Sequence, residues 1–207
     1  MTPSLTLVRR RLPAQQRSKQ RVERILLAAS TLLTTSSVDK LTTRRISELA
    51  DVNIATLYQF FPNKEAIIFA LYQRWLSEMD DVFDRMEMKQ SKQMGWRKLF
   101  SKIFDALNQV KTDLIVRDRL LKAMGMNEDL RQLDLDHSIL LSKRLAKLMA
   151  NQGAYLSEYE LQEHGTLIFH FERALVTPLA NAKGNDQEVL YKKGRDFLLE
   201  MISLAFR

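Results

Sequence analysis

This chain of 207 residues has no cysteine, only 6 glycines and 4 prolines, and no long apolar run. Without cysteine it can form no disulfide, no thiolate metal site and no cysteine nucleophile. So few turn-forming residues argue against a sheet of many strands, because each hairpin turn needs one or two of them. No apolar run approaches the roughly 18–20 residues that a membrane-spanning helix requires.

Positive charge is concentrated near the N-terminal end. Residues 1–65 hold 11 Lys and Arg against 5 Asp and Glu, whereas residues 66–207 hold 21 against 20. A basic end on a nearly neutral body indicates an end that meets a polyanion, although a solvated basic tail would give the same charge. The first 20 residues are basic without an apolar core, so they do not fit a secretory signal. We therefore expect a cytoplasmic protein with no membrane partner.

Apolar residues recur every three or four positions along most of the chain, which is the spacing of α-helices. Four such stripes run from Val22 to Leu33, from Ile68 to Met86, from Trp96 to Val110 and from Leu130 to Leu148. A further short helix is expected near 114–124, ending at Gly125. Residues 87–95 are polar and read as a connection. No alternating pattern of useful length predicts a strand, so we predict an all-α fold.

The C-terminal third carries more apolar surface than one small chain can cover. Ser157 and Glu160 form an S-x-x-E capping box for a helix that Pro178 should kink or end. Its stretch 167–180 is apolar on most of its circumference, and such a helix must be covered on several sides. A last helix near 186–206 also keeps a broad apolar surface, with Gly194 permitting close approach. We expect a homodimer through the helices near 157–183 and 186–206; the alternative is that both helices are core.

Residues 41–65 (LTTRRISELADVNIATLYQFFPNKE) fit a helix-turn-helix. Thr42 or Thr43 begins the first helix, and Ser47 is small where two helices would cross. Asp51 stands at a sharp turn that needs a positive φ, which Gly adopts freely and Asp tolerates. Asn53 can cap the second helix. The side chains expected to face inward are Ile46, Leu49, Ala50, Leu57 and Phe61.

The outward residues of the second helix suit entry into a DNA major groove. Gln pairs with adenine N6 and N7, Thr bonds base edges or phosphate, and an Ala methyl contacts a thymine methyl. A plain helical hairpin with a solvated face is the alternative. The expected outward residues include Phe60. The predicted DNA contacts are Thr42, Thr43, Arg44, Arg45, Asn53, Ala55, Thr56, Tyr58, Gln59 and Lys64.

Residues 20–66 resemble the DNA-binding domain of the TetR family of bacterial transcriptional regulators. The resemblance rests on Ala28-Ala29, Leu41-Thr42-Thr43, Thr56-Leu57-Tyr58, Phe61 and Asn63-Lys64-Glu65 at the family's spacing. It covers about a quarter of the chain. It implies a homodimer of helical subunits, with three N-terminal helices on DNA and about six more forming a small-molecule pocket and a dimer face.

The resemblance also implies roles for single residues. Thr43, Thr56, Tyr58 and Lys64 would contact the operator. Asp51 replaces the turn glycine that the family usually has, and Phe60 stands where a Tyr or His often contacts phosphate. Asn53 replaces the common Ser and keeps the cap.

We therefore predict a sequence-specific transcriptional regulator: a repressor that a small-molecule effector releases from a near-palindromic operator. Residues 1–19 would be a basic arm, either disordered or reaching a minor groove through Arg9–Arg11. Residues 20–66 would bind DNA, and residues 67–207 would bind effector and dimerise. The alternatives are a DNA-binding dimer without a small-molecule ligand, controlled by a protein partner or abundance, and an all-helical enzyme or protein-binding bundle.

The effector pocket is the least defined part of the prediction. We expect no cofactor and no catalytic or metal-binding set, since His137, His164 and His170 lie far apart in the sequence. The aromatic and methionine content favours an apolar effector, although core packing explains the same residues. The pocket candidates are Trp96, Phe100, Phe104, Met124, His137, Phe169, His170 and Arg173.

Overall fold

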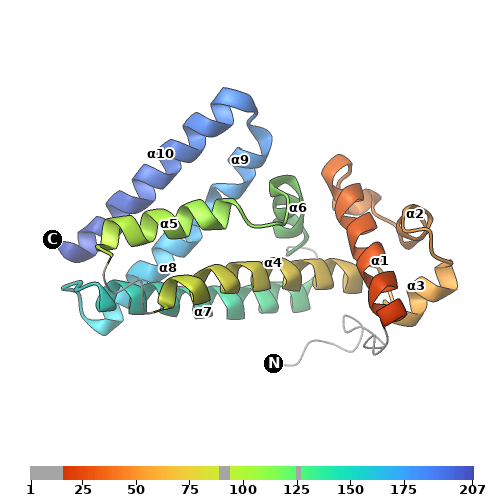
Figure 1. Cartoon of the computed structure of the whole chain (residues 1–207), viewed down its shortest axis with the longest axis horizontal. Helices are drawn as coiled ribbons and strands as arrows, with labels where there is room; N and C mark the ends of the chain where they lie inside the picture. Colours follow the sequence, from red (N-terminus) through yellow and green to blue (C-terminus); the bar gives the residue numbers. More distant parts are fainter. Residues whose placement is uncertain (1–15, 89–93, 125–126) are drawn as a thin grey trace. The chain divides into compact units, whose positions relative to one another are not determined.

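The computed structural model describes residues 16–88, 94–124 and 127–207, and every regular element in these ranges is helical (Figure 1). This confirms the predicted all-α class. No helix in the described part of the chain combines the length and the apolar composition needed to cross a membrane. The α-helices are α1 (Gln16–Thr35), α2 (Thr43–Leu49), α3 (Ile54–Phe60), α4 (Lys64–Glu87), α5 (Trp96–Asn108), α6 (Leu114–Met124), α7 (Glu128–Asn151), α8 (Glu158–Ala174), α9 (Val176–Asn181) and α10 (Gly184–Ser203).

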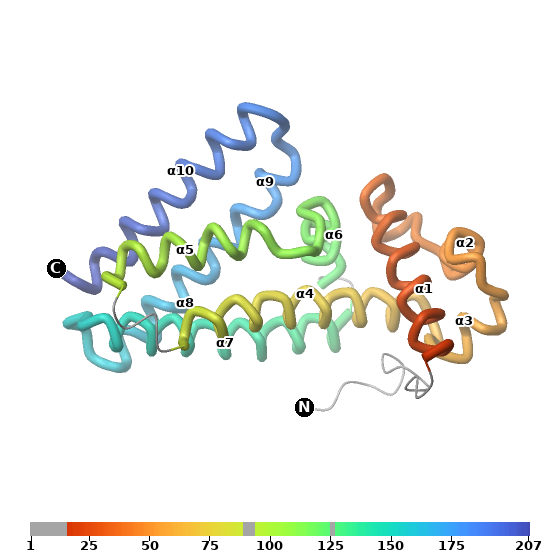
Figure 2. The backbone as a smooth tube through the Cα atoms, viewed as in Figure 1, coloured from red at the N-terminus to blue at the C-terminus, as the bar shows by residue number. Residues whose placement is uncertain are grey.

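The chain divides into two compact units. The first extends to Trp75 and includes Ile115–Leu133, and the second comprises Leu76–Leu114 and Asp134–Arg207. Helices α4 and α7 therefore each supply residues to both units, as the continuous tube in Figure 2 shows for each helix. The predicted division between residues 66 and 67 lies inside the first unit and stays a prediction about function.

Three helices of the first unit, α2, α3 and α4, begin at side-chain caps. Thr42 accepts a hydrogen bond from the Arg45 amide at 3.2 Å and begins α2. Asn53 and Asn63 do the same at the starts of α3 and α4, each accepting a backbone N–H at 2.8 Å. These caps satisfy amides that have no partner within their own helix. The side chains buried beneath the three N-terminal helices include Ile25, Leu26, Leu33, Ile46 and Leu57.

The second unit contains the predicted capping box and the predicted break at proline. Ser157 and Glu160 bond each other's backbone N–H at the start of α8. Helix α8 ends at Ala174, and α9 begins at Val176, so that Pro178 lies in the first turn of α9. Proline is tolerated there because the first amides of a helix have no intrahelical acceptor.

Two helical glycines allow close packing inside the second unit. A Cβ at Gly165 of α8 would lie 2.5 Å from the backbone oxygen of Ser142 in α7. A Cβ at Gly194 of α10 would meet the Leu175 side chain at 2.7 Å. Gly194 therefore permits the close approach that was expected, and the residue that approaches it is Leu175 of the same chain.

Three expectations fall wholly or partly outside the described residues. They are the arm with Arg9–Arg11, the polar connection at 89–93 and the helix end at Gly125. Residues 16–19, which we counted in the arm, form the first turn of α1.

We predict that Gly165→Ala destabilises the chain although Ala is the better helix former. The added methyl group must push backbone away from backbone, so the free energy of unfolding should fall by about 1–2 kcal/mol after the propensity gain is subtracted. Gly194→Ala is the matched control, because its methyl group meets a side chain that can rotate. Urea unfolding of both variants checks this; equal stabilities would contradict the packing of α8 on α7.

Candidate nucleic-acid interface

The turn between α2 and α3 has the backbone that a helix-turn-helix requires. Asp51 has φ of 50°, and it is the one non-glycine residue with a positive φ in the part of the chain that the structure describes. The Val52 amide donates back to the Ser47 carbonyl at 3.1 Å. Ser47 itself is buried, and its hydroxyl donates to the Arg44 carbonyl at 2.8 Å. The small residue and the left-handed turn thus allow α3 to leave α2 sharply, as predicted.

Helix α3 exposes most of the side chains predicted to contact DNA. Asn53, Ala55, Tyr58 and Gln59 are exposed, and Thr56 is half-buried. The Tyr58 hydroxyl lies 3.0 Å from Thr43 Oγ1, so a side-chain hydrogen bond joins α3 to the first residue of α2. Helix α3 has the sequence IATLYQF, which contains no acidic residue. The exposed face therefore offers amide, hydroxyl and methyl groups without a carboxylate of its own.

The cationic flanks of α3 are held by weak interactions. Arg44 pairs with Glu48 one turn along α2 at 3.0 Å, and Arg45 donates to the Lys40 carbonyl at 3.0 Å. Lys64, half-buried, begins α4. Because an exposed ion pair contributes little free energy, Arg44 and Arg45 could exchange their present partners for phosphate oxygens at little cost.

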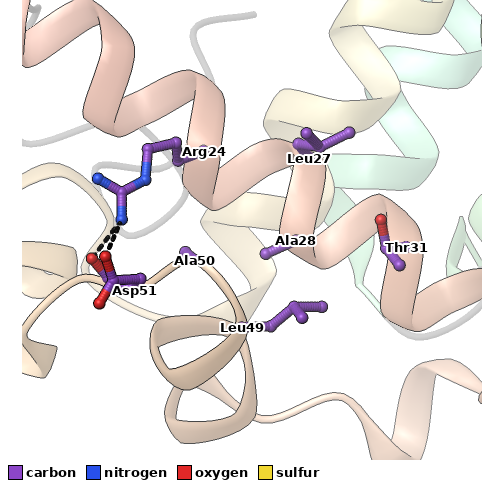
Figure 3. Close-up of a pocket in the computed structure, with 7 residues that line it drawn as sticks. All are labelled: Arg24, Leu27, Ala28, Thr31, Leu49, Ala50 and Asp51. Carbon is purple, nitrogen blue, oxygen red and sulfur yellow. Dashed lines mark hydrogen bonds and ion pairs between the residues drawn. The ribbon is translucent and has the colours of Figure 1, made fainter.

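Two residues of the motif lie on the opposite side from the one we expected. Phe60 is only 3% exposed, and Leu49 is 51% exposed. Phe60 follows Leu57 by three positions, so both share the buried face of α3 with the adjacent Phe61. Leu49 instead borders an open groove of about 280 Å³ between α1 and α2, with Leu27 and Ala28 opposite (Figure 3). A phosphate contact by Phe60 is therefore ruled out.

Comparison with known families agrees with this geometry. Residues 25–71 match the model of the bacterial regulatory proteins of the tetR family. Residues 25–71 therefore form a TetR-family N-terminal domain. The family consists of bacterial regulatory proteins, so the match favours DNA-binding regulation over the enzyme alternative. A search of the curated proteins finds no match.

Solved structures show that the likeness in fold extends over nearly the whole chain. A transcriptional regulator from Rhodococcus sp. Rha1 superposes with a TM-score of 0.73 at 12% identity, covering 88% of this chain and 96% of the other. A putative TetR-family regulator from Rhodococcus sp. gives 0.72 at 15% identity, covering 91% and 100%. A TetR-family regulator from Streptomyces coelicolor gives 0.60 at 24% identity, covering 89% and 99%.

Among the described residues, two of the predicted effector-pocket residues line a common cavity. Phe104 and Phe169 line a small cavity in the second unit, together with Met79, Phe83, Leu107, Leu145, Ile168 and Glu172. Its volume of about 10 Å³ is roughly the room that one water molecule needs. This cavity is therefore too small for an organic effector in the described conformation.

The other six pocket candidates lie elsewhere. Trp96 stacks on Phe206, with ring centroids 4.9 Å apart. Phe100 is fully buried, whereas His170 is exposed on α8. Arg173 is paired with Asp134. Met124 belongs to the first unit, and His137 belongs to the second.

Sequence reasoning missed a charged cluster in the second unit that surrounds Arg144 of α7. Its guanidinium contacts three acids of α4: Asp84 at 2.5 Å, Glu87 at 2.8 Å and Asp80 at 3.6 Å. The signal was present, since acids four and three positions apart share one face of a helix. Acids on a solvated helix face would show the same spacing. Only the position of Arg144 in the structure distinguishes a charged cluster from a solvated face.

His137 is buried beside this cluster. Its Nε2 lies 3.4 Å from Asp80 Oδ1, while Asp134 and Arg144 are the other charged groups that act on it. Burial lowers the pKa of His137 below its ordinary value of 6.5, because loss of water disfavours the imidazolium more than Asp80 favours it. The folded chain therefore holds this histidine neutral at a pH where the unfolded chain begins to bind a proton.

We predict that His137 makes the chain less stable in mild acid. Since the unfolded state binds the extra proton, this stability is fully present above pH 6.5 and is lost as the pH falls below it. Urea unfolding between pH 7.5 and 5 should show a smaller loss for His137→Gln than for the unchanged chain. An equal or larger loss for His137→Gln would contradict the burial argument.

Proposed function

We propose that this TetR-family regulator is a cytoplasmic repressor that binds a near-palindromic operator as a homodimer. The observation that carries the proposal is the exposed, acid-free face of α3, which begins directly after the Asn53 cap and is flanked by cations. A short helix of this kind fits the major groove with its N-terminal residues at the base edges. The predicted contacts stay as stated: Thr42, Thr43, Arg44, Arg45, Asn53, Ala55, Thr56, Tyr58, Gln59 and Lys64.

The side chains divide into those that read bases and those that hold the backbone. Gln59 can donate and accept at adenine, and Ala55 presents a methyl group to thymine. Lys64, Arg44 and Arg45 supply charge for phosphates, which fixes position but carries no sequence information. The Thr43–Tyr58 hydrogen bond supports a role for both residues at the edge of the groove.

The proposed dimer interface is an exposed apolar patch on α8 and α10. Phe171 of α8 and Phe197 of α10 stack with their ring centroids 4.6 Å apart, and Phe197 remains 51% exposed. Leu167 of α8 and Leu204, the residue after the end of α10, are exposed as well. Pairing two such patches about a two-fold axis would bury both of them. An operator with half-sites one helical turn apart would require the two recognition helices of such a dimer to lie about 34–36 Å apart, in successive major grooves.

Two modes of control remain as proposals. In the first, an apolar effector enlarges the cavity between Phe104 and Phe169 and stabilises a conformation with weaker operator binding; a typical coupling of about 1–3 kcal/mol would change affinity 5–150-fold. In the second, no small molecule binds, and a protein partner or abundance controls the repressor. The cavity volume of about 10 Å³ means that the first mode requires a conformational change before an organic molecule can enter there.

Selection of genomic DNA fragments by the purified chain tests the proposed function. We expect recovery of a near-palindrome whose half-sites lie one helical turn apart, and its neighbouring genes would indicate the physiological signal. Titrating the resulting complex with a panel of apolar compounds separates the two modes of control. Fragments without a shared motif would contradict sequence-specific binding.

Substitutions at Gln59 and Lys64 should have different effects on binding. Gln59→Ala should reduce discrimination at one base pair of each half-site by about 1–3 kcal/mol. Lys64→Ala should weaken binding to all sequences alike and flatten the slope of log affinity against log salt by about one unit. Fluorescence anisotropy on the selected duplex and on single-base variants measures both; unchanged binding in both variants would remove α3 from the interface.

A charge placed in the α8–α10 patch should separate the subunits. Phe197→Glu should give monomers in sedimentation and weaken operator binding by about 100-fold or more, because the two half-sites are no longer bound as one unit. Leu140→Glu, which charges an exposed apolar position on α7, is the matched control and should leave the dimer intact. A dimeric Phe197→Glu chain would place the interface elsewhere.

A further inference from the structure

Arg24 of α1 makes two hydrogen bonds to Asp51, the residue at the helix-turn-helix turn. Its Nη2 donates to the Asp51 backbone carbonyl and, at 2.8 Å, to the carboxylate Oδ2 of the same residue (Figure 3). The two residues are 27 positions apart in the sequence and belong to the same unit. One guanidinium therefore bonds both the backbone and the side chain of the turn.

The turn has a physical need for such support. Asp51 has a left-handed backbone with φ of 50°, which costs a side-chain-bearing residue free energy that glycine does not lose. Asp tolerates this region better than most residues, but the conformation persists only when its surroundings hold it. A contact that fixes the Asp51 carbonyl offsets part of this free-energy cost, which a glycine at the turn would not have.

The peptide that follows Asp51 is held at both of its polar ends. Its carbonyl accepts from Arg24, and its amide, on Val52, donates to the Ser47 carbonyl at 3.1 Å. Because a peptide unit is planar, these two bonds fix the orientation of the whole unit. Asn53, the cap of α3, follows one residue later. The direction in which α3 leaves the turn is therefore tied to α1 through this one peptide.

The same contact also balances a negative charge near the recognition helix. The Asp51 side chain is 98% exposed, so an unpaired carboxylate there would oppose the approach of phosphates in a domain that is otherwise basic. The Arg24 guanidinium offsets that charge. The Arg24 side chain is itself half-exposed, so the ion pair lies at the surface and not in the core.

We propose that Arg24 is a positioning residue for operator recognition, acting through the Asp51–Val52 peptide and the Asp51 carboxylate. It need touch no base, and it gives α1 a part in recognition beyond packing under α2 and α3. The proposal rests on the proposed DNA-binding function. It also explains how this chain tolerates Asp at position 51. A glycine there would need no partner such as Arg24.

The effect should appear in recognition and not in global stability. An ion pair this exposed contributes little to folding, and the buried side chains of α1, such as Ile25 and Leu26, are unchanged in Arg24→Ala. The expected variant is therefore folded, with an unfolding midpoint close to that of the unchanged chain but a looser turn.

The first measurement needs no DNA. Amide hydrogen exchange at Val52 should be about three- to ten-fold faster in Arg24→Ala, because opening of the turn peptide is less opposed. Arg21→Ala removes a positive charge one turn earlier on the same helix and is the matched control. In an Asp51→Gly background, removing Arg24 should change the exchange rate less. Equal exchange at Val52 in the unchanged chain and in Arg24→Ala would overturn the proposal.

The second measurement uses the duplex that the unchanged chain selects, with a scrambled duplex of equal length. Arg24→Ala should lose about five-fold more affinity for the selected duplex than Arg21→Ala does, and this excess should vanish in the Asp51→Gly background. If the unchanged chain prefers no duplex, the proposed function fails while the exchange result still decides the role of Arg24. If it does prefer one but the two arginine variants bind alike, the positioning role is wrong. A fall in unfolding midpoint that parallels the binding loss would make Arg24 merely structural.

Discussion

A recognition helix of seven residues cannot hold itself in place in water. Isolated helices shorter than about 12–15 residues are marginal, and α3 runs only from Ile54 to Phe60. Helix α3 is stabilised by the burial of Leu57 and Phe60 together with the following Phe61, and by the Asn53 cap at its start. Every feature of the proposed DNA face depends on this anchoring, because the exposed side chains have fixed directions only while the buried ones are packed.

That constraint explains both corrections on the motif. Seven residues contain too few turns for the apolar spacing to define a single inner face, and the adjacent Phe60 and Phe61 fit an inward position equally well in the sequence. Packing resolves the ambiguity by burying both. In α2 the reverse happens: Ile46, Ser47 and Ala50 fill the crossing, so Leu49 is left beside the open groove with α1 (Figure 3).

Local chemistry made most of the fold predictable, and side-chain packing limited the rest. Capping at Asn53, the positive φ of Asp51 and the break before Pro178 follow from preferences of single residues, and the structure confirms them. Contacts between residues far apart in the sequence leave no such signal. The pairing of Arg24 with Asp51 and the dispersal of the predicted pocket residues were therefore beyond reach of spacing arguments.

The charged cluster on α4 and α7 limits how an effector could act. Arg144 is largely buried, and it contacts Asp84, Glu87 and Asp80 while lying over the ring of Phe83. Removing the partners of a buried charge costs about 3–5 kcal/mol, and the partial exposure of these acids lowers that figure. It still equals or exceeds the roughly 1–3 kcal/mol of a typical allosteric coupling. An effector that separated these segments of α4 and α7 would spend most of its binding energy there. A ligand entering between Phe104 and Phe169 would instead have to displace apolar side chains and leave the Arg144 cluster intact.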